Sequence, residues 1–282
     1  MISNIAVVGG GGVGGYIAAK LSEVASVDLI TSSLKSLRVE ERGAIKSYRP
    51  TILAAPPKKK IYDLVIFAVK SYQLEEKAAS ILPHTHKRTL ILPLLNGIEP
   101  YEKLSRIFSH AKVLKGAVYI ISNRHGDLVR LKGKGAMIVM EHCGERCEEI
   151  AHMFQQAGIK VQLHENVDEA IWQKYLFIAA TAALTTYHSK TFGQIASEHG
   201  EEFEELLDEI GRIAEKRGIS LDKERAVELL RRSPADAKTS LQLDFERGEE
   251  TELDNIVGYL AKESRAFAKI YEALATPRSR KA

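Results

Sequence analysis

The sequence has little net charge, few cysteines and no long apolar run. Its 282 residues carry a formal charge of +3, too small an excess to indicate binding to nucleic acid or to an anionic membrane. No apolar run reaches the roughly 18 residues that a transmembrane helix requires. The first residues also lack the basic segment, apolar core and cleavage site of a secretory signal. We therefore expect a cytoplasmic protein that acts on small molecules.

The two cysteines are too few for a disulfide framework. Cys143 and Cys147 form, with His142, a local His-Cys-x-x-x-Cys cluster of the kind that can bind zinc. Two surface thiols in a turn are the simpler interpretation. We expect those thiols and no metal site.

A glycine-rich loop near the start of the chain carries the clearest functional motif. The apolar residues 5–8 run directly into Gly9, Gly11 and Gly14, which have the Gly-x-Gly-x-x-Gly spacing, and a helical pattern follows. In a dinucleotide-binding loop the first glycine permits a tight turn, the second lets the backbone approach a pyrophosphate, and the third lets helix and strand pack closely. Gly12 belongs to the same loop. The alternative is a flexible glycine loop without a ligand.

The pattern of hydrophobic residues indicates two domains, as the length also allows, since domains commonly hold roughly 100–200 residues. Apolar runs of strand length lie at residues 26–30, 62–69, 88–95, 113–121, 126–132 and 135–140, the last three as an antiparallel extension. Helical periodicity follows at residues 166–188, 201–217, 222–232 and 250–274. The sequence therefore predicts an α/β, Rossmann-type dinucleotide-binding domain over residues 1–165 and an all-helical domain for substrate binding and homodimer formation over residues 166–282.

The residues after the second predicted strand indicate which dinucleotide binds. NAD sites usually place an acidic residue there, about 20 residues after the glycines, to bind the ribose 2′-hydroxyl. Residues 31–38 contain no acid; they offer hydroxyls such as Ser32 and the basic groups Lys35 and Arg38, which suit a 2′-phosphate. We expect NADPH as the cofactor. In the alternative, Lys35 and Arg38 are solvated charges at the start of a helix.

Two further polar residues follow predicted strands at the edge where ligands bind in open α/β sheets. Lys70 comes after the strand at 62–69, and Asn96 comes after the strand at 88–95. Both are candidates for the cofactor site, and Asn96 also for the substrate site. Either residue could instead cap the element that follows it.

The first predicted helix of the second domain carries Lys174 within an otherwise apolar stretch. Such a lysine can extend its ammonium to the surface. If it faces a cleft instead, desolvation lowers its pKa and makes it a better proton donor near neutral pH.

Several short motifs occur in a fixed order along nearly the whole chain. They are the glycine loop 9–14, residues 68–73, Asn96-Gly97, Trp172-Gln-Lys174, residues 239–244 with Gly248, and residues 251–254 with Gly258. With this set the sequence resembles the ketopantoate reductase (2-dehydropantoate 2-reductase) family, within the 6-phosphogluconate-dehydrogenase-like group.

The resemblance implies NADPH-dependent reduction of ketopantoate to (R)-pantoate, on the route to pantothenate and coenzyme A. Carried over by position, Lys174 is the proton donor to the substrate carbonyl, and Ser240 binds the carboxylate region of the substrate. Glu252 matches a glutamate that contacts the cofactor. Lys70 and Asn96 match residues that line the cofactor and carbonyl site.

One part of the substrate site departs from the family. The family has asparagines four and eight residues after the lysine and one near the following loop, where this chain has Ile178, Ala182 and Phe192. Thr181 and Thr185 follow Lys174 by seven and eleven residues, close to the side of the helix that carries it, and could supply substrate hydrogen bonds. Such threonines more often donate to a carbonyl in the preceding turn of their own helix. The alternatives to ketopantoate reduction are therefore an NADP-dependent reductase of a more apolar 2-keto acid, or a non-catalytic NADP-binding sensor.

Overall fold

The computed structural model describes residues 2–276, which form two compact units. The first unit runs to Leu95 and continues over Pro100–Val167; the second contains Asn96–Glu99 and the chain from Asp168 onward. The division after Val167 lies beside the expected boundary after residue 165. No sequence pattern indicated that Asn96–Glu99 would group with the helical unit. No helix within residues 2–276 is long and apolar enough to cross a membrane.

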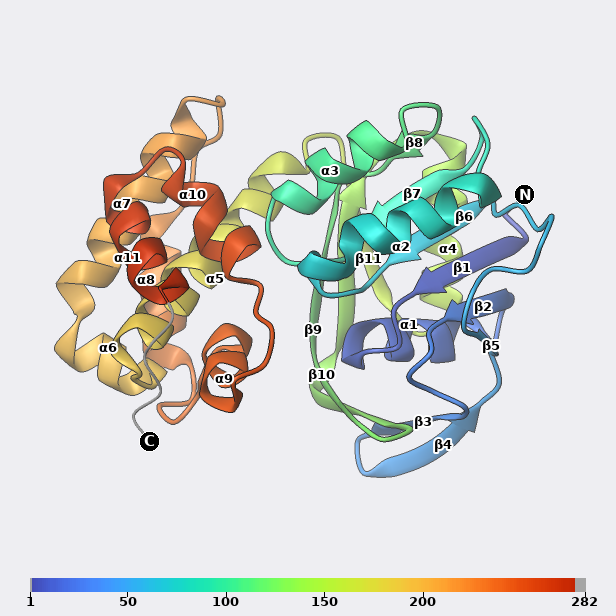
Figure 1. Ribbon diagram of the computed structural model, residues 1–282, viewed down its shortest axis with the longest axis horizontal. Helices are drawn as coiled ribbons and strands as arrows, with labels where there is room; N and C mark the ends of the chain where they lie inside the picture. The colour runs from blue at the N-terminus through green and yellow to red at the C-terminus, as the bar shows by residue number, and fades with distance from the viewer. Residues whose placement is uncertain (1, 277–282) are drawn as a thin grey trace. The chain divides into compact units, whose positions relative to one another are not determined.

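The first unit contains a parallel sheet of six strands in the order β5-β2-β1-β6-β7-β8 (Figure 1). The strands are β1 (Asn4–Val8), β2 (Ser26–Ile30), β5 (Thr51–Leu53), β6 (Leu64–Phe67), β7 (Leu90–Pro93) and β8 (Lys112–Val113). Every residue of β6 and β7 is buried, as their continuous apolar sequences require of central parallel strands. The strand order reverses between β1 and β6, so the loops after these two strands meet at the topological switch point, where such sheets bind ligands.

Helices of the same unit connect these strands. They are α1 (Gly12–Leu21), α2 (Leu74–Ile81), α3 (Glu99–Ile107) and α4 (Glu145–Gln156), with 3-10 turns η1 (Ser71–Gln73) and η2 (Leu82–His84). Apolar side chains of α1, α4 and the sheet share one buried cluster, and those of α2 and α3 belong to a second cluster. The position of α1 therefore depends on core packing, and its first turn follows β1 directly.

A second sheet has the order β11-β10-β3-β4, with β9 paired to β10. Its strands are β3 (Leu37–Glu41), β4 (Ala44–Tyr48), β9 (Gly116–His125), β10 (Leu128–Glu141) and β11 (Lys160–His164). The antiparallel extension is present as β9 and β10, but the two strands expected at 126–132 and 135–140 are one strand with a register shift between Lys132 and Met137. The hairpin β3–β4 and strand β11 were not expected, because their residues are mostly exposed or half-buried and too polar to stand out.

The second unit is helical, with α5 (Asp168–His188) packed against most of the other helices (Figure 1). The others are α6 (Phe192–Glu198), α7 (Gly200–Glu215), α8 (Lys223–Arg232), α9 (Ser240–Arg247), α10 (Tyr259–Ala261) and α11 (Arg265–Ala275), with a π-helical turn η3 (Asp254–Gly258). Because α5 is apolar around much of its circumference, it is covered on several sides. The single helix expected at 250–274 is interrupted, and Ser264 caps the start of α11 by accepting a hydrogen bond from the Phe267 amide.

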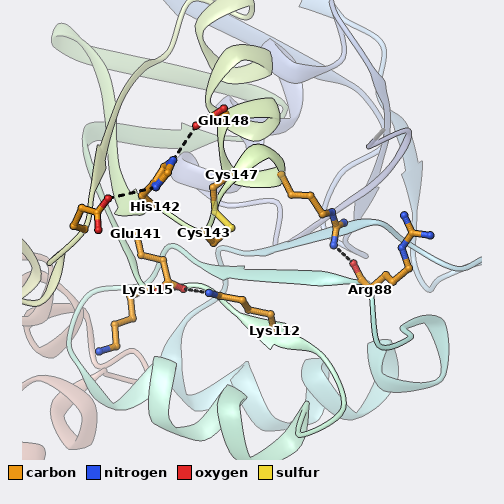
Figure 2. The surroundings of a disulfide bond; sticks show 10 residues. Arg88, Lys112, Lys115, Glu141, His142, Cys143, Cys147 and Glu148 are labelled. Carbon is orange, nitrogen blue, oxygen red and sulfur yellow. Dashed lines mark hydrogen bonds and ion pairs between the residues drawn. A yellow bond between two sulfur atoms is a disulfide. The ribbon is translucent and has the colours of Figure 1, made fainter.

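The prediction of two surface thiols was wrong, because Cys143 and Cys147 form a disulfide (Figure 2). Cys143 follows β10 and Cys147 lies in the first turn of α4, where Gly144 (φ +86°) turns the chain between them. This turn brings the two Cα atoms to 5.3 Å, within the usual disulfide range. Cys147 is fully buried, and the neighbouring His142 pairs with Glu148 at 3.0 Å.

Candidate functional site

The glycine loop between β1 and α1 has the geometry of a dinucleotide-binding turn. Gly9 has φ +112°, and a Cβ there would lie 2.5 Å from the Ala68 carbonyl oxygen. A Cβ on Gly14 would lie 2.1 Å from the Gly9 carbonyl oxygen, so only glycine allows the helix to pack this closely on the strand. At Gly11 the same position meets no atom within 4 Å. Protein atoms thus crowd the first and third glycines, whereas the second has open space beside it.

The start of α1 fits a phosphate group. Gly11 is the N-cap and has no side chain, so the first amides of the helix receive no side-chain cap. Unpaired amides and the positive end of the helix dipole attract anions at this position. The open space beside Gly11 gives a pyrophosphate room to approach. These residues therefore fit a dinucleotide cofactor.

Gly12 has a structural reason to be glycine that the motif does not reveal. A Cβ there would lie 2.5 Å from the Ser122 carbonyl oxygen of β9. Gly12 therefore lets the first turn of α1 pack against the second sheet. Its predicted role toward the cofactor rests on the loop motif alone.

Lys70 lies near the glycine loop, as expected for the switch point. It follows β6, precedes the 3-10 turn η1, and its carbonyl accepts a hydrogen bond from the Gln73 amide at 2.9 Å. Two residues earlier, Ala68 touches the Gly9 position. The half-buried Lys70 side chain thus belongs to the same sheet edge as the glycines.

The residues after β2 form no helix, and Arg38 lies in strand β3. Its guanidinium donates two hydrogen bonds to the Asp127 carboxylate, at 3.0 and 2.8 Å. Ser32 and Lys35 are exposed between β2 and β3. Lys35 makes no ion pair with any residue in the part of the chain that the structure describes. Of the two basic groups, Lys35 is therefore the one with its charge available to a ligand.

Lys174 and Asn96 meet in the helical unit. The half-buried Lys174 ammonium donates a hydrogen bond to Asn96 Oδ1 at 2.9 Å. Burial lowers the pKa of Lys174 to about 8, because desolvation disfavours the charged amine. The lowered pKa and the contact with Asn96 favour a proton-donor role over that of a solvated surface lysine. The Lys174 ammonium points to Asn96, which lies in the segment that follows β7.

Asn255, which the sequence did not single out, holds Asn96 in place. Its Nδ2 donates to the Asn96 backbone carbonyl at 2.7 Å, and its side chain packs on Gly97, where a Cβ would lie 2.8 Å from Asn255 Oδ1. Asn255 belongs to the π-helical turn η3, where the Ile256 carbonyl accepts a hydrogen bond from the Tyr175 hydroxyl at 2.9 Å. The expected motif at 251–254 ends one residue before Asn255, and no pattern in the sequence marks it.

A small pocket of about 160 Å³ lies beside these residues. Its volume is close to the ~150 Å³ of a cavity that binds benzene. It is lined by Asn96, Phe177, Ile178, Thr181, Ala182, Phe192, Thr239, Ser240, Leu241, Glu252 and Ile256. The structure thus brings together four of the predicted site residues, Asn96, Thr181, Ser240 and Glu252.

Much of the pocket lining is apolar. It includes Ile178, Ala182 and Phe192, the three residues at which the resemblance leads us to expect asparagines. Phe177, which sequence reasoning missed, lies edge to face with Phe192, with ring centroids 6.1 Å apart. The helical offset of three from Lys174 could have indicated Phe177.

The two threonines of α5 direct their hydroxyl groups back to the helix. Thr181 donates to the Phe177 carbonyl at 2.6 Å, and Thr185 donates to the Thr181 carbonyl at 2.8 Å. Thr185 is fully buried and contacts the Thr239 hydroxyl at 2.9 Å. Thr181 therefore faces the pocket as an acceptor, while Thr185 joins α5 to the cap of α9. This arrangement does not favour Thr185 as a substrate-binding residue.

Comparison with known proteins identifies the family. The model of "Ketopantoate reductase PanE/ApbA" matches residues 5–143, and that of the corresponding C-terminal domain matches residues 166–273. The chain belongs to the ketopantoate reductase family. As a member it is an NAD(P)-dependent oxidoreductase with a Rossmann-type domain followed by a helical domain.

Individual relatives cover almost the whole chain. The chain is 30% identical to the uncharacterized oxidoreductase YkpB of Bacillus subtilis, over 96% of this chain and 95% of that protein. It is 28% identical to a 2-dehydropantoate 2-reductase of Vibrio cholerae, over 92% and 90% of the two chains. A crystal structure of a PanE/ApbA family ketopantoate reductase from Ralstonia eutropha superposes with a TM-score of 0.88, at 24% identity over 97% of each chain.

Proposed function

We propose that this chain is an NADPH-dependent 2-keto acid reductase whose substrate is ketopantoate, which it reduces to (R)-pantoate on the route to pantothenate. The observation that carries the proposal is the Lys174 ammonium. Burial lowers its pKa to about 8, and Asn96 holds it beside a pocket that contains Ser240 and Glu252. A positioned acid with a pKa near the working pH is what the reduction of a carbonyl group requires.

The chemistry assigns a role to each of these groups. The glycine loop would hold NADPH, which would supply the hydride for the carbonyl carbon. Negative charge develops on the carbonyl oxygen, where the Lys174 ammonium stabilises it and donates the proton that completes the hydroxyl group. Asn96 Oδ1 accepts a hydrogen bond from Lys174 and orients the ammonium. Ser240 binds the substrate carboxylate region, and Glu252 contacts the cofactor.

We propose NADPH rather than NADH as the reductant because of the residues after β2. This segment lacks the acidic residue that binds a ribose 2′-hydroxyl in NAD sites, and it exposes Ser32 and Lys35. An ammonium and a hydroxyl group both favour a 2′-phosphate. With Arg38 already paired to Asp127, Lys35 is the main cationic contact in this proposal.

A second candidate is the reduction of a more apolar 2-keto acid. One support is the apolar pocket lining of Phe177, Ile178, Ala182 and Phe192. Another is the Thr181 hydroxyl, which donates its hydrogen bond to the Phe177 carbonyl of the same helix. A non-catalytic NADP-binding sensor is less well supported, because such a protein would have no need of a half-buried lysine with a lowered pKa.

The test is a panel of 2-keto acids, assayed by the loss of NADPH absorbance. Ketopantoate and 2-ketoisovalerate differ mainly by one hydroxymethyl group, so their kcat/KM values compare the two candidate substrates directly. Turnover of ketopantoate supports the proposal. Turnover of 2-ketoisovalerate but not of ketopantoate supports the second candidate, and no NADPH oxidation with any 2-keto acid would overturn both.

Homodimer formation is a separate part of the proposal. We propose that the helical unit forms the dimer interface. Size-exclusion chromatography with light scattering measures the mass of the protein in solution directly. A mass of one chain at working concentration would contradict it.

A further inference from the structure

Three helix ends in the helical unit bring two imidazoles and a carboxylate together. His188 is the last residue of α5, His199 lies between α6 and α7, and Glu202 is in the first turn of α7. None of the three lines the pocket described above. The proposed reductase function leaves this cluster unexplained.

The donor atoms of the cluster converge. His188 Nε2 lies 2.7 Å and His199 Nδ1 lies 3.3 Å from the same carboxylate oxygen, Glu202 Oε2. The ligand atoms of the three residues all lie within 4.8 Å of one another. In a tetrahedral zinc site with bonds of about 2.0–2.2 Å, neighbouring ligand atoms are roughly 3.3 Å apart. The His199–Glu202 contact already has about this spacing, and the His188–Glu202 contact would lengthen by roughly 0.6 Å to hold an ion.

The backbone that carries these ligands is well held. The His199 amide donates to the Ile195 carbonyl at 3.0 Å, and its own carbonyl accepts from the Phe203 amide at 2.9 Å. Tyr187 packs edge to face against His188, with ring centroids 4.9 Å apart. The side chains of His188, His199 and Glu202 are 22%, 23% and 36% exposed, so an ion can reach them from solvent.

The charges around the cluster favour a cation. His188 ends α5 and His199 follows the last turn of α6, so the partial negative charge of two helix C-termini lies nearby. The N-terminus of α7 opposes a cation, but Glu201 and Glu202 in its first turn offset that effect. Lys190, two residues after His188 in the sequence, is paired with Glu198 at 2.9 Å.

We propose that His188, His199 and Glu202 bind a divalent transition-metal ion, with Zn²⁺ as the best match and water completing its coordination. Two imidazole nitrogens and one carboxylate oxygen are a ligand set typical of zinc, and unsuited to Mg²⁺ or Ca²⁺. The two rings are now stacked, with centroids 3.8 Å apart and an interplanar angle of 21°. Binding requires them to tilt apart about their Cβ–Cγ bonds, a torsion that is broad for histidine.

The ion would join the ends of α5, α6 and α7. His188 Nε2 gives up its hydrogen bond to Glu202, and His199 Nδ1 gives up its 3.3 Å contact with the same oxygen, when each nitrogen turns a lone pair to the metal. The carboxylate then ligates the metal instead of accepting from the rings. Because an ion that binds only the folded chain stabilises it, Zn²⁺ raises the unfolding temperature of the protein.

The experiment is calorimetric titration of chelator-treated, full-length protein with Zn²⁺, without cofactor, keto acid or reductant. We expect one ion per chain and a rise in Tm at saturating Zn²⁺. In His188→Gln and in His199→Gln, Kd should rise by at least ~10-fold, since even second-shell changes cost 10–100-fold in metal affinity. Glu202→Gln keeps both rings and should weaken binding as well, and far-UV circular dichroism checks that each variant is folded.

Two controls separate this cluster from other ligands. His152→Gln removes an exposed imidazole on α4 and should leave Kd unchanged. Cys143→Ser with Cys147→Ser removes the cysteines as ligands and should also leave it unchanged. The proposal is overturned if the parent protein binds no Zn²⁺, or if folded His188→Gln and His199→Gln bind it as tightly as the parent.

Discussion

At the scale of single residues, Lys174 carries the proposed chemistry. We predict that Lys174→Ala lowers kcat by ~10²-fold or more, the usual contribution of general acid catalysis, while NADPH binding is kept. Steady-state kinetics and a fluorescence titration of NADPH measure the two effects. Lys223→Ala, which removes a surface lysine paired with Asp208, is the control. Activity within a few-fold of the parent would show that Lys174 is not the proton donor.

The same residue predicts a pH dependence. A proton donor acts while it is protonated, and the lowered pKa of Lys174 is about 8. We therefore expect kcat for keto acid reduction to be highest below pH ~8 and to fall as the pH rises above that value, well before the ordinary lysine range near 10.4. A kcat profile that stays flat to pH ~10 would rule out Lys174 as the group that controls the reaction.

Lys35 is the residue that should distinguish the two cofactors. We predict that the parent binds NADPH more tightly than NADH, and that Lys35→Ala raises Kd for NADPH ~5-fold, about 1 kcal/mol for an exposed ion pair. The Kd for NADH should hardly change. Arg38→Ala is the matched control, because the Arg38 guanidinium is already paired with Asp127. Equal binding of both cofactors by the parent would contradict the prediction.

The apolar lining of the pocket leads to a prediction about substrate preference. With Ile178 and Ala182 in the pocket, we expect the kcat/KM ratio of ketopantoate to 2-ketoisovalerate to lie well below the ~10⁴ of a site built to pair a hydroxyl group. KM for ketopantoate should be high and kcat less affected. Ala182→Asn should raise the ratio. A parent ratio at or above ~10⁴ would mean that other polar groups, such as Ser240, pair the hydroxyl.

At the scale of elements, the π-helical turn η3 is expected to position the catalytic lysine through Asn255. Losing its hydrogen bond to the Asn96 carbonyl frees the segment that aims Asn96 at Lys174. We predict that Asn255→Ala lowers kcat by ~10- to 100-fold, because small misplacements of catalytic groups are costly. It should also move the fall of kcat to lower pH, because the Lys174 ammonium loses the acceptor that stabilises its charged form.

The neighbouring residue of the same turn provides the control for Asn255. Asp254→Asn keeps the side-chain size and an acceptor for the Tyr271 hydroxyl, which now donates to Asp254 at 2.8 Å. It should leave the pH dependence in place. If both variants alter stability but neither moves the pH profile, the role of Asn255 is structural only.

Elements also differ in how readily the sequence reveals them. Strands β6 and β7 are continuous apolar runs, and α7 and α8 have clear helical periodicity, so their positions could be predicted. The hairpin β3–β4 could not, because β4 has no buried residue and forms through pairing with β3. The break at residues 262–264 was also missed, although Ser264 is a typical helix cap.

For the molecule as a whole, the two kinds of domain, the glycine loop and the set of candidate residues could be predicted from the sequence alone. These features depend on local patterns: apolar runs, glycines at fixed spacing and one lysine within an apolar helix. The family comparison then identified the chain as an NAD(P)-dependent oxidoreductase.

Which of these residues meet depends on how the chain packs in three dimensions. Lys174 meets Asn96 at 2.9 Å, and Asn255 supports Asn96, because segments far apart in the sequence pack together. The disulfide of Cys143 and Cys147 depends on the turn between them. The direction of the threonine hydroxyl groups is likewise set by the helix carbonyls beside them. Sequence patterns predict the secondary structure of a residue and the face of the helix or strand on which it lies. The partner of a polar group is selected by packing in three dimensions, because a buried donor or acceptor must find one there.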